Sequence, residues 1–118
     1  MPERSDERRI QSEIQLAACA GGGPARLWRN NVGALKDANG RLVRYGLCPG
    51  SSDLIGLRTR IITEADLGHR FAQFVAIEVK DRGRLTTEQQ AFITMVQQAG
   101  GLAGVAHDVH EARAILRL

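Results

Sequence analysis

The sequence predicts an α/β fold in which helices flank a mixed central sheet. Three observations predict this class: an apolar pattern of helical spacing opens the chain, strand-like runs separated by turn residues fill the middle, and helix and strand signals alternate towards the end. The chain has 118 residues, enough for one modest hydrophobic core. We therefore expect a single domain over 1–118, with the order helix, about three strands, helix, strand, helix.

The first half of the chain contains a predicted helix and a predicted hairpin. Ser5–Ala20 has apolar residues at helical spacing, and Gly21–Gly23 supplies its end. Ala25–Val32 has a weak extended character. Asn39-Gly40 suits the tight turn of a hairpin between two antiparallel strands. A loop rich in Gly, Pro and Ser then leads into an apolar strand that begins at Asp53.

The second half begins with a short apolar strand, Phe74–Lys80, that has charged residues near its C-terminal end. Side chains of a strand alternate between its two faces. One face should carry Val75, Ile77 and Val79, and the other Phe74, Ala76, Glu78 and Lys80. A carboxylate and an ammonium group are therefore expected to lie side by side at the end of this strand.

Two helices and a strand complete the predicted fold. Thr86–Ala99 should be a helix with a capping box formed by Thr86 and Gln89, a buried face marked by Phe92, Val96 and Ala99, and a Gly-Gly end. Residues 102–107 resemble a strand. Asp108 and Glu111 repeat the capping spacing before a last helix that carries Ala112, Ile115 and Leu116.

Composition excludes several classes of protein. Hydrophobic residues make up 43% and charged residues 25% of the chain, which argues against global disorder. No apolar run approaches the ~20 residues of a membrane span, and the first residues lack the apolar core of a secretory signal. We expect a cytoplasmic protein without a membrane partner. Cys19 and Cys48 form no metal or redox motif, so both are expected to be free thiols without a chemical role.

Basic residues are unevenly chosen, with fourteen arginines against two lysines, Lys36 and Lys80. The planar guanidinium group binds phosphate in two places, which favours a nucleic-acid partner. A coding bias towards arginine explains the same composition equally well. The positions of the arginines must separate these two interpretations.

Two carboxylates could meet if the strands that carry them pair. Asp53 stands at the entrance of one predicted strand and Glu78 near the end of another. Carboxylates with open positions suit Mg²⁺, a hard cation that prefers oxygen ligands. Lys80 lies two residues beyond Glu78, where an ammonium group could position a water molecule or offset developing charge. On their own, Glu78 and Lys80 are better explained as a solvated strand end whose charges limit edge pairing.

Four elements in order identify a resemblance. Glu13 lies in the first helix, Asp53 follows a Gly/Ser loop, Glu78-Val79-Lys80 ends a strand, and "GRLTTEQQAF" precedes a Gly-Gly helix end. This order resembles the virus-type replication-repair nuclease domain (VRR-NUC), a branch of the PD-(D/E)XK nuclease superfamily. The resemblance runs from about Glu7 to the C-terminus. It implies a restriction-endonuclease-like αβββαβ core with a C-terminal helix.

The resemblance implies a role for each of these residues. Asp53 and Glu78 would bind Mg²⁺, with Mn²⁺ as an alternative cation, and the main-chain carbonyl of Val79 would complete the ligand set. Lys80 would assist catalysis. Glu13 would join the site directly or through water, although a solvated helix face explains it too. Ser52 stands where the family motif has its proline, which puts the shape of this loop in doubt.

Gln89 matches a glutamine that the family carries after its E-x-K motif, and it also fits a capping box with Thr86. Both interpretations stay open. Arginines near the site, namely Arg26, Arg29, Arg82 and Arg84, could hold DNA phosphates or could be solvated surface charges. Trp28 is better explained as a core residue than as a stacking platform.

The predicted function is that of a Mg²⁺-dependent, structure-selective endodeoxyribonuclease that uses a metal-activated water. Small phage-type members of the family suggest a homodimer that acts on branched DNA, as resolvases of four-way (Holliday) junctions do. The alternatives are a non-catalytic DNA-binding or assembly module and a nuclease that cuts linear duplex. His107 and His110 have the spacing of a zinc site but lack a third ligand, so zinc is not expected.

Overall fold

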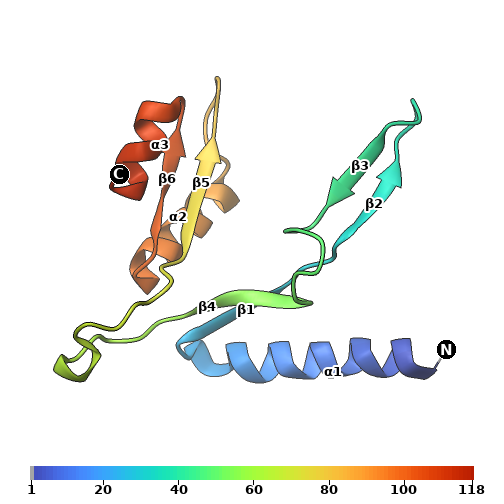
Figure 1. Ribbon diagram of the computed structural model, residues 1–118, viewed down its shortest axis with the longest axis horizontal. Coiled ribbons are helices and arrows are strands. Elements are labelled where there is room, and N and C mark those ends of the chain that lie inside the picture. Colours follow the sequence, from blue (N-terminus) through green and yellow to red (C-terminus); the bar gives the residue numbers. More distant parts are fainter. Residues whose placement is uncertain (1) are drawn as a thin grey trace. The chain divides into compact units, whose positions relative to one another are not determined.

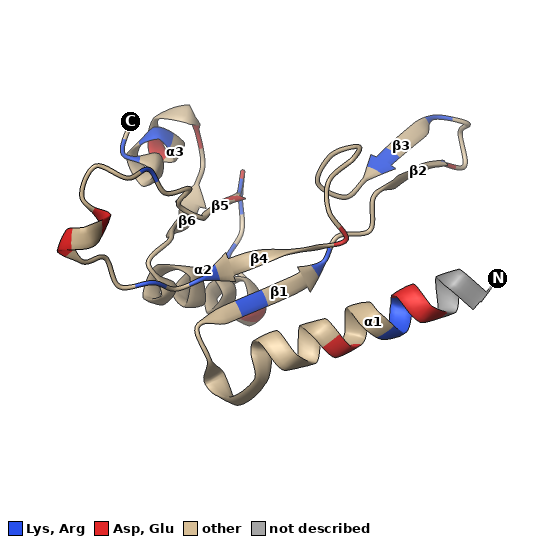
Figure 2. Cartoon of the chain, turned by 60° about the horizontal axis from the view of Figure 1, so that its bottom comes forward, with Lys and Arg blue, Asp and Glu red and all other residues tan. Residues whose placement is uncertain are grey.

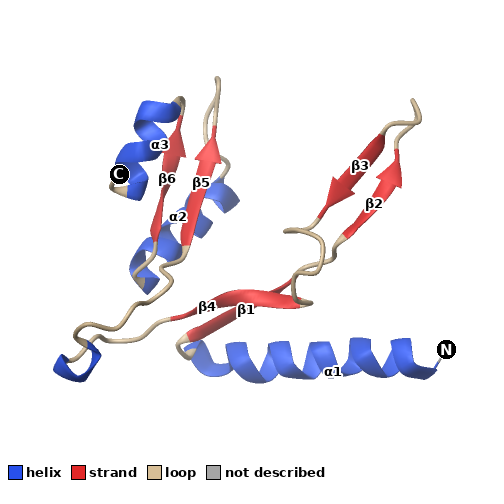
Figure 3. Ribbon diagram, in the orientation of Figure 1, coloured by secondary structure: helices blue, strands red, loops and turns tan. Residues whose placement is uncertain are grey.

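The computed structural model describes residues 2–118, with side chains described from Asp6 onward. The chain forms two compact units, Met1–Arg58 and Thr59–Leu118. Figures 1 and 3 show helices and paired strands in both units. We describe each unit by itself.

The first unit is built on a helix that packs against a strand pair. Helix α1 spans Pro2–Cys19 and continues into a 3₁₀ turn, η1 (Ala20–Gly22), in which Gly21 and Gly22 have φ values of 65° and 66°. These positive angles favour glycine, so the glycine run ends the helix as predicted. Strand β1 (Ala25–Arg29) packs on α1 and pairs antiparallel with β4 (Leu54–Arg58).

A hairpin lies between β1 and β4 in the chain. Strands β2 (Gly33–Lys36) and β3 (Leu42–Tyr45) pair antiparallel, as the Asn39-Gly40 dipeptide predicts. The loop is longer than a two-residue turn, because Asp37 N donates to Arg41 O at 2.8 Å and only Gly40, with φ of 79°, has a positive angle. This is the pattern of a three-residue loop with glycine at its left-handed position.

The second unit carries a parallel strand pair and two helices. Its elements in order are η2 (Glu64–Asp66), β5 (Val75–Val79), α2 (Thr87–Ala99), β6 (Leu102–Ala106) and α3 (Val109–Leu116). Strands β5 and β6 pair in parallel and lie side by side in Figure 1. A parallel pair needs a crossover connection, and α2 supplies it.

Helices α2 and α3 cover opposite faces of the β5–β6 pair. Ala76 and Glu78 line a pocket together with residues of α2, while a Cβ built on Gly104 would meet Ile115 of α3 at 3.0 Å. Gly104 is the register partner of Ile77, so Ile77 belongs to the α3 face. Ile77 also contributes to the lining of the pocket on the α2 side, so the predicted alternation is clearest at Glu78 and Lys80, whose side chains form an ion pair.

The core of the second unit lies between these layers. Its buried residues are Ile93, Val96, Ala103 and Ala106, and Val96 has no exposed surface. Phe92 was predicted on the buried face of α2, and this is wrong, because its side chain is 39% exposed. The buried stripe runs instead through Ile93 and Val96, three residues apart, and leaves Phe92 at the margin.

The helix ends agree with the sequence. The Thr86 side chain accepts from Gln89 N, and the Gln89 side chain accepts from Thr86 N, each at 3.0 Å, which is the predicted capping box. Gly100 ends α2 with φ of 103°. Asp108 caps α3 by accepting from Glu111 N at 2.8 Å.

The predicted fold class is confirmed. The chain is α/β, and its order is αβββαβ followed by a C-terminal helix, with the β2–β3 hairpin added between β1 and β4. Both parallel and antiparallel pairs occur, but the described residues form three two-stranded sheets within the separate units and not the one mixed central sheet that the sequence predicts. Across residues 2–118, none of the helices combines the length and apolar character that a bilayer crossing requires.

Candidate active site

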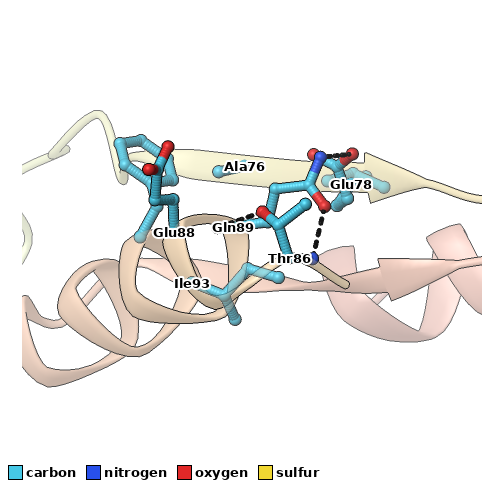
Figure 4. Close-up of a pocket in the computed structure, with 8 residues that line it drawn as sticks. Ala76, Glu78, Thr86, Glu88, Gln89 and Ile93 are labelled. Carbon is cyan, nitrogen blue, oxygen red and sulfur yellow. Dashed lines mark hydrogen bonds between the residues drawn. The ribbon is translucent and has the colours of Figure 1, made fainter. Parts of the chain in front are cut away.

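A pocket opens in the second unit between β5 and the first turns of α2, with a volume of about 610 Å³. Figure 4 shows its side chains rising from both elements. The residues that line it are Ala76, Ile77, Glu78, Thr86, Glu88, Gln89, Phe92 and Ile93. The pocket therefore has an apolar floor and polar groups supplied by one strand and one helix end.

Glu78 is the carboxylate that this pocket holds in place. Its Oε1 accepts a hydrogen bond from Gln89 Nε2 at 2.9 Å and lies 3.8 Å from Lys80 Nζ. Both contacts fall on the same oxygen, and within the described part of the chain no hydrogen bond reaches Oε2. The Glu78 side chain is 34% exposed. Glu78 is thus oriented by one hydrogen bond and one ion pair, and Oε2 takes part in neither.

Gln89 uses the two ends of its amide for two purposes. Its Oε1 accepts from Thr86 N and completes the capping box, while its Nε2 donates to Glu78 (Figure 4). The sequence left open whether Gln89 caps the helix or belongs to the site. The structure shows both contacts at once, because a side-chain amide carries an acceptor and a donor on one rigid plane.

Lys80 continues the strand beyond β5. Its backbone N donates to Ala106 O at 3.1 Å, which extends the β5–β6 ladder, and its side chain is only 21% exposed. The ion pair with Glu78 shows that both side chains share one face, as the alternation predicts. Val79 lies between them in sequence and is 74% exposed. Side chains alternate along a strand, so the Val79 side chain points to the opposite face from Glu78 and Lys80.

Asp53 lies in the first unit, directly before β4, as predicted. Its backbone oxygen accepts from Asn30 N at 2.8 Å, and its side chain is exposed. The preceding loop is fixed by the Asn30 side chain, whose Nδ2 donates to Ser51 Oγ at 2.7 Å and to Ser52 O at 3.0 Å, and whose Oδ1 accepts from Leu47 N at 2.9 Å. Asn30 therefore holds the loop where the family motif has a proline.

Glu13 also lies in the first unit, on an exposed part of α1. Its Oε1 accepts from Arg9 at 3.0 Å, one helical turn away. The adjacent Ser12 accepts from Arg29 at 2.6 Å, and Arg29 is the register partner of Leu54. This chain of contacts brings the helix segment of Glu13 to the end of β4 at which Asp53 lies.

The four predicted DNA-binding arginines are distributed over both units. Arg82 and Arg84 are exposed in the loop between Lys80 and α2, and neither forms an ion pair within the described part of the chain. Arg26 is half-buried in β1, and Arg29 is exposed but bonded to Ser12. Arg82 and Arg84 therefore have the freer guanidinium groups.

Glu78 is the carboxylate of the pocket whose chemistry fits a hard divalent cation. Among residues 2–118, no group of three or more His, Cys, Asp or Glu residues gathers as a metal cluster. The structure places Glu78 and Asp53 in different units, and the available oxygen of Glu78 is a ligand of the kind that Mg²⁺ prefers.

The two thiols are free, and Cys19 Sγ accepts from Leu27 N at 3.3 Å. His107 lies 3.0 Å from Glu111 and forms an ion pair when protonated.

Sequence reasoning missed part of the site. Asn30 was not singled out, and no local motif marks it, because its contacts depend on a loop about twenty residues later. Glu88 and Phe92 were not proposed as pocket residues. The pairs Glu88 with Phe92 and Gln89 with Ile93 have the four-residue spacing of one helix face, which could have predicted that they line a common surface.

One comparison with known proteins identifies the family. The model of the VRR-NUC domain matches residues 6–110, which is nearly the whole chain. Searches of curated proteins and of solved structures gave no match. VRR-NUC domains have a restriction-endonuclease-like fold and are nucleases of the PD-(D/E)XK type, which implies DNA as the substrate. The chain therefore belongs to the VRR-NUC domain family.

Proposed function

We propose that this domain is a Mg²⁺-dependent endodeoxyribonuclease that recognises DNA structure. The observation that carries this proposal is the arrangement around Glu78, which lines the pocket together with Gln89. Its carboxylate accepts a hydrogen bond from Gln89 at 2.9 Å and forms an ion pair with Lys80 at 3.8 Å. Pre-oriented charged groups act on developing charge without reorganising first. This is the arrangement that hydrolysis of a phosphodiester requires.

We propose Asp53, Glu78 and the main-chain carbonyl of Val79 as the groups that hold the cation. Glu78 is proposed as a ligand because its Oε2 accepts no hydrogen bond from the described residues. Asp53 is proposed because it directly precedes β4, the place that the order of the family motif gives to the acidic ligand. A bound Mg²⁺ would supply Lewis-acid chemistry, which polarises the phosphoryl oxygen and makes water more acidic. Mn²⁺ prefers similar oxygen ligands and is the first substitute to try.

Lys80 would act on the phosphate itself. Hydrolysis joins a water oxygen to phosphorus and breaks one P–O ester bond, and negative charge grows on the phosphoryl oxygens as it proceeds. The Lys80 side chain is 21% exposed, so its charge lies closer to the protein than that of a fully exposed lysine. We propose that it orients the attacking water and offsets the developing charge.

Gln89 and Glu13 have supporting roles in this proposal. Gln89 positions Glu78 through a hydrogen bond, and partners of this kind are worth about 10- to 100-fold in metal affinity or activity. Glu13 would join through water from the helix segment that contacts Arg29. Four arginines would bind DNA phosphates, namely Arg26, Arg29, Arg82 and Arg84. Arg82 and Arg84 are the best candidates, because neither forms an ion pair with another described residue.

We propose branched DNA as the preferred substrate and a homodimer as the active form. A chain of 118 residues offers few groups for reading bases, so shape is the simpler signal. A two-fold dimer presents two equal sites to two strands, which matches the symmetry of a four-way junction.

The test is cleavage of a labelled four-way junction and of a linear duplex with the same sequence, each with Mg²⁺, Mn²⁺ or EDTA. The wild type should cut the junction with Mg²⁺ and fail in EDTA. Lys80→Ala should lose about 10²-fold or more in rate, whereas Arg113→Gln, a charge change on α3, should cut normally.

Three outcomes would change the proposal. Equal cutting of both DNAs would remove the preference for junctions and leave the chemistry. A monomer that cuts at the wild-type rate would remove the dimer. Metal-independent, salt-sensitive DNA binding without any cutting would replace the nuclease with a DNA-binding or assembly module.

A further inference from the structure

The β2–β3 hairpin has two unlike faces. Register pairs lie on the same face of a strand pair, so Leu35, Val43 and Tyr45 share one face, and Ala34, Lys36, Leu42 and Arg44 share the other. Tyr45 covers Gly33 on the first face, where a Cβ on Gly33 would meet the ring. The second face, which we call the basic hairpin face, carries the two cations Lys36 and Arg44.

The cations of this hairpin are not held in ion pairs by the described residues. Within the described part of the chain, neither Lys36 nor Arg44 forms an ion pair, and the same holds for Arg41 in the turn. The one carboxylate nearby, Asp37, uses its Oδ1 to accept from Asn39 N and Arg41 N, both at 2.9 Å. Figure 2 shows basic segments on this hairpin in blue.

Like charges on one face of a hairpin repel each other. Lys36 and Arg44 are diagonal neighbours, a position in which side chains lie ~7–8 Å apart. This distance is within the Debye length of ~8–10 Å at ordinary salt. A polyanion that binds along the face removes the repulsion and gains two contacts. DNA offers one negative charge per ~3.4 Å of axis on each strand, a spacing that both cations can use.

We propose that the basic hairpin face binds the phosphate backbone of the DNA substrate. Lys36 and Arg44 are the two contacts. The contact is independent of sequence and lies outside the groups that hold the cation and act on the phosphorus. This proposal rests on the proposed function, because DNA is the polyanion it assigns.

The test is the salt dependence of DNA binding, measured in EDTA so that no cleavage occurs. The probes are a labelled linear duplex and a four-way junction, and the full chain is titrated between about 50 and about 200 mM salt. The plot of log K against log salt has a negative slope, and each phosphate contact removed should reduce the magnitude of that slope by about one. Lys36→Gln with Arg44→Gln should therefore lower it by about two, and affinity near 0.1 M should fall about tenfold per contact.

Two variants control this measurement. Lys36→Arg with Arg44→Lys keeps both charges at the same positions and should retain the wild-type slope. Arg8→Gln with Arg113→Gln removes two charges from helices α1 and α3 and should lower the slope by less than one. All four side chains are exposed, so none of these changes opens a cavity.

A wild-type slope in the Lys36→Gln, Arg44→Gln variant would overturn the proposal. A change of oligomeric mass in that variant, with the slope retained, would also overturn it and would make the hairpin a contact between protein chains. The proposed nuclease fails separately: a wild type that binds DNA with the full slope but never cuts with Mg²⁺ would refute cleavage and leave the hairpin contact standing.

Discussion

Gln89 offers a way to separate the stability of α2 from the orientation of Glu78. Its Oε1 serves the capping box and its Nε2 serves Glu78, so Gln89→Ala removes both contacts. Thr86→Ala removes the other half of the capping box and leaves the amide contact with Glu78 in place. Comparing the two variants isolates the hydrogen bond to the carboxylate.

The expected losses of stability follow from the contacts. Thr86→Ala should lower the free energy of unfolding by about 1 kcal/mol, the usual value for a lost cap. Gln89→Ala loses half of the box and a hydrogen bond to a charged group, which is discounted because Glu78 is 34% exposed. We expect about 1–2 kcal/mol for this variant. At about 4 °C per kcal/mol for a chain of this size, the melting temperatures should fall by about 4 °C and about 4–8 °C.

The activities should separate more sharply than the stabilities. At a temperature where both variants are folded, Thr86→Ala should cut DNA near the wild-type rate. Gln89→Ala should lose about 10- to 100-fold in rate or need about 10- to 100-fold more Mg²⁺ for half-maximal cutting. The assay is cleavage of a labelled junction over a Mg²⁺ titration, beside thermal melting. Equal activity of the two variants would refute a positioning role for Gln89 and leave it a capping residue only.

The remaining predictions concern packing and a buried charge in the second unit. Val96→Ala empties a site with 0% exposure and should lower the free energy of unfolding by about 2 kcal/mol, measured by urea denaturation. Gly101→Ala would place a Cβ 2.7 Å from Phe74 O, so a loss of about 1–3 kcal/mol is expected in the same assay, and an unchanged midpoint would contradict this packing. Asp66, 5% exposed, accepts from Arg60 and from the backbone of its own turn. Asp66→Asn should cost about 1–2 kcal/mol in the same assay, and the stability of the variant should depend less on salt than that of the wild type.

Local signals in the sequence were reliable where the interaction itself is local. The spacing of Thr86 and Gln89 predicted a capping box because its atoms lie within one helical turn, and Asn39-Gly40 predicted a hairpin because only a few residues set a turn. The segment around Glu64 contains a capped 3₁₀ turn, η2, and the spacing of Thr63 and Asp66 is a local signal of the same kind.

Features that depend on distant partners could not be predicted in the same way. Phe92 and Ile93 are adjacent apolar residues of one helix, and nothing local decides which of them is buried. The choice depends on where α2 meets β5 and β6. Asn30 is likewise an ordinary polar residue until the loop before Asp53 folds back onto it.

The sequence by itself determined the α/β class, the order of the elements, the family, and the residues proposed for the chemistry, because these depend on periodicity, caps and motif order along the chain. Only the tertiary structure decided that Gln89 holds Glu78 through the spare end of a capping amide, and that Lys36 and Arg44 share one face of a hairpin. A hydrogen bond between a strand and a helix, and the register of two strands, are fixed by how separate segments pack. That packing reflects the burial of Val96 and its neighbours, which no short window of sequence contains.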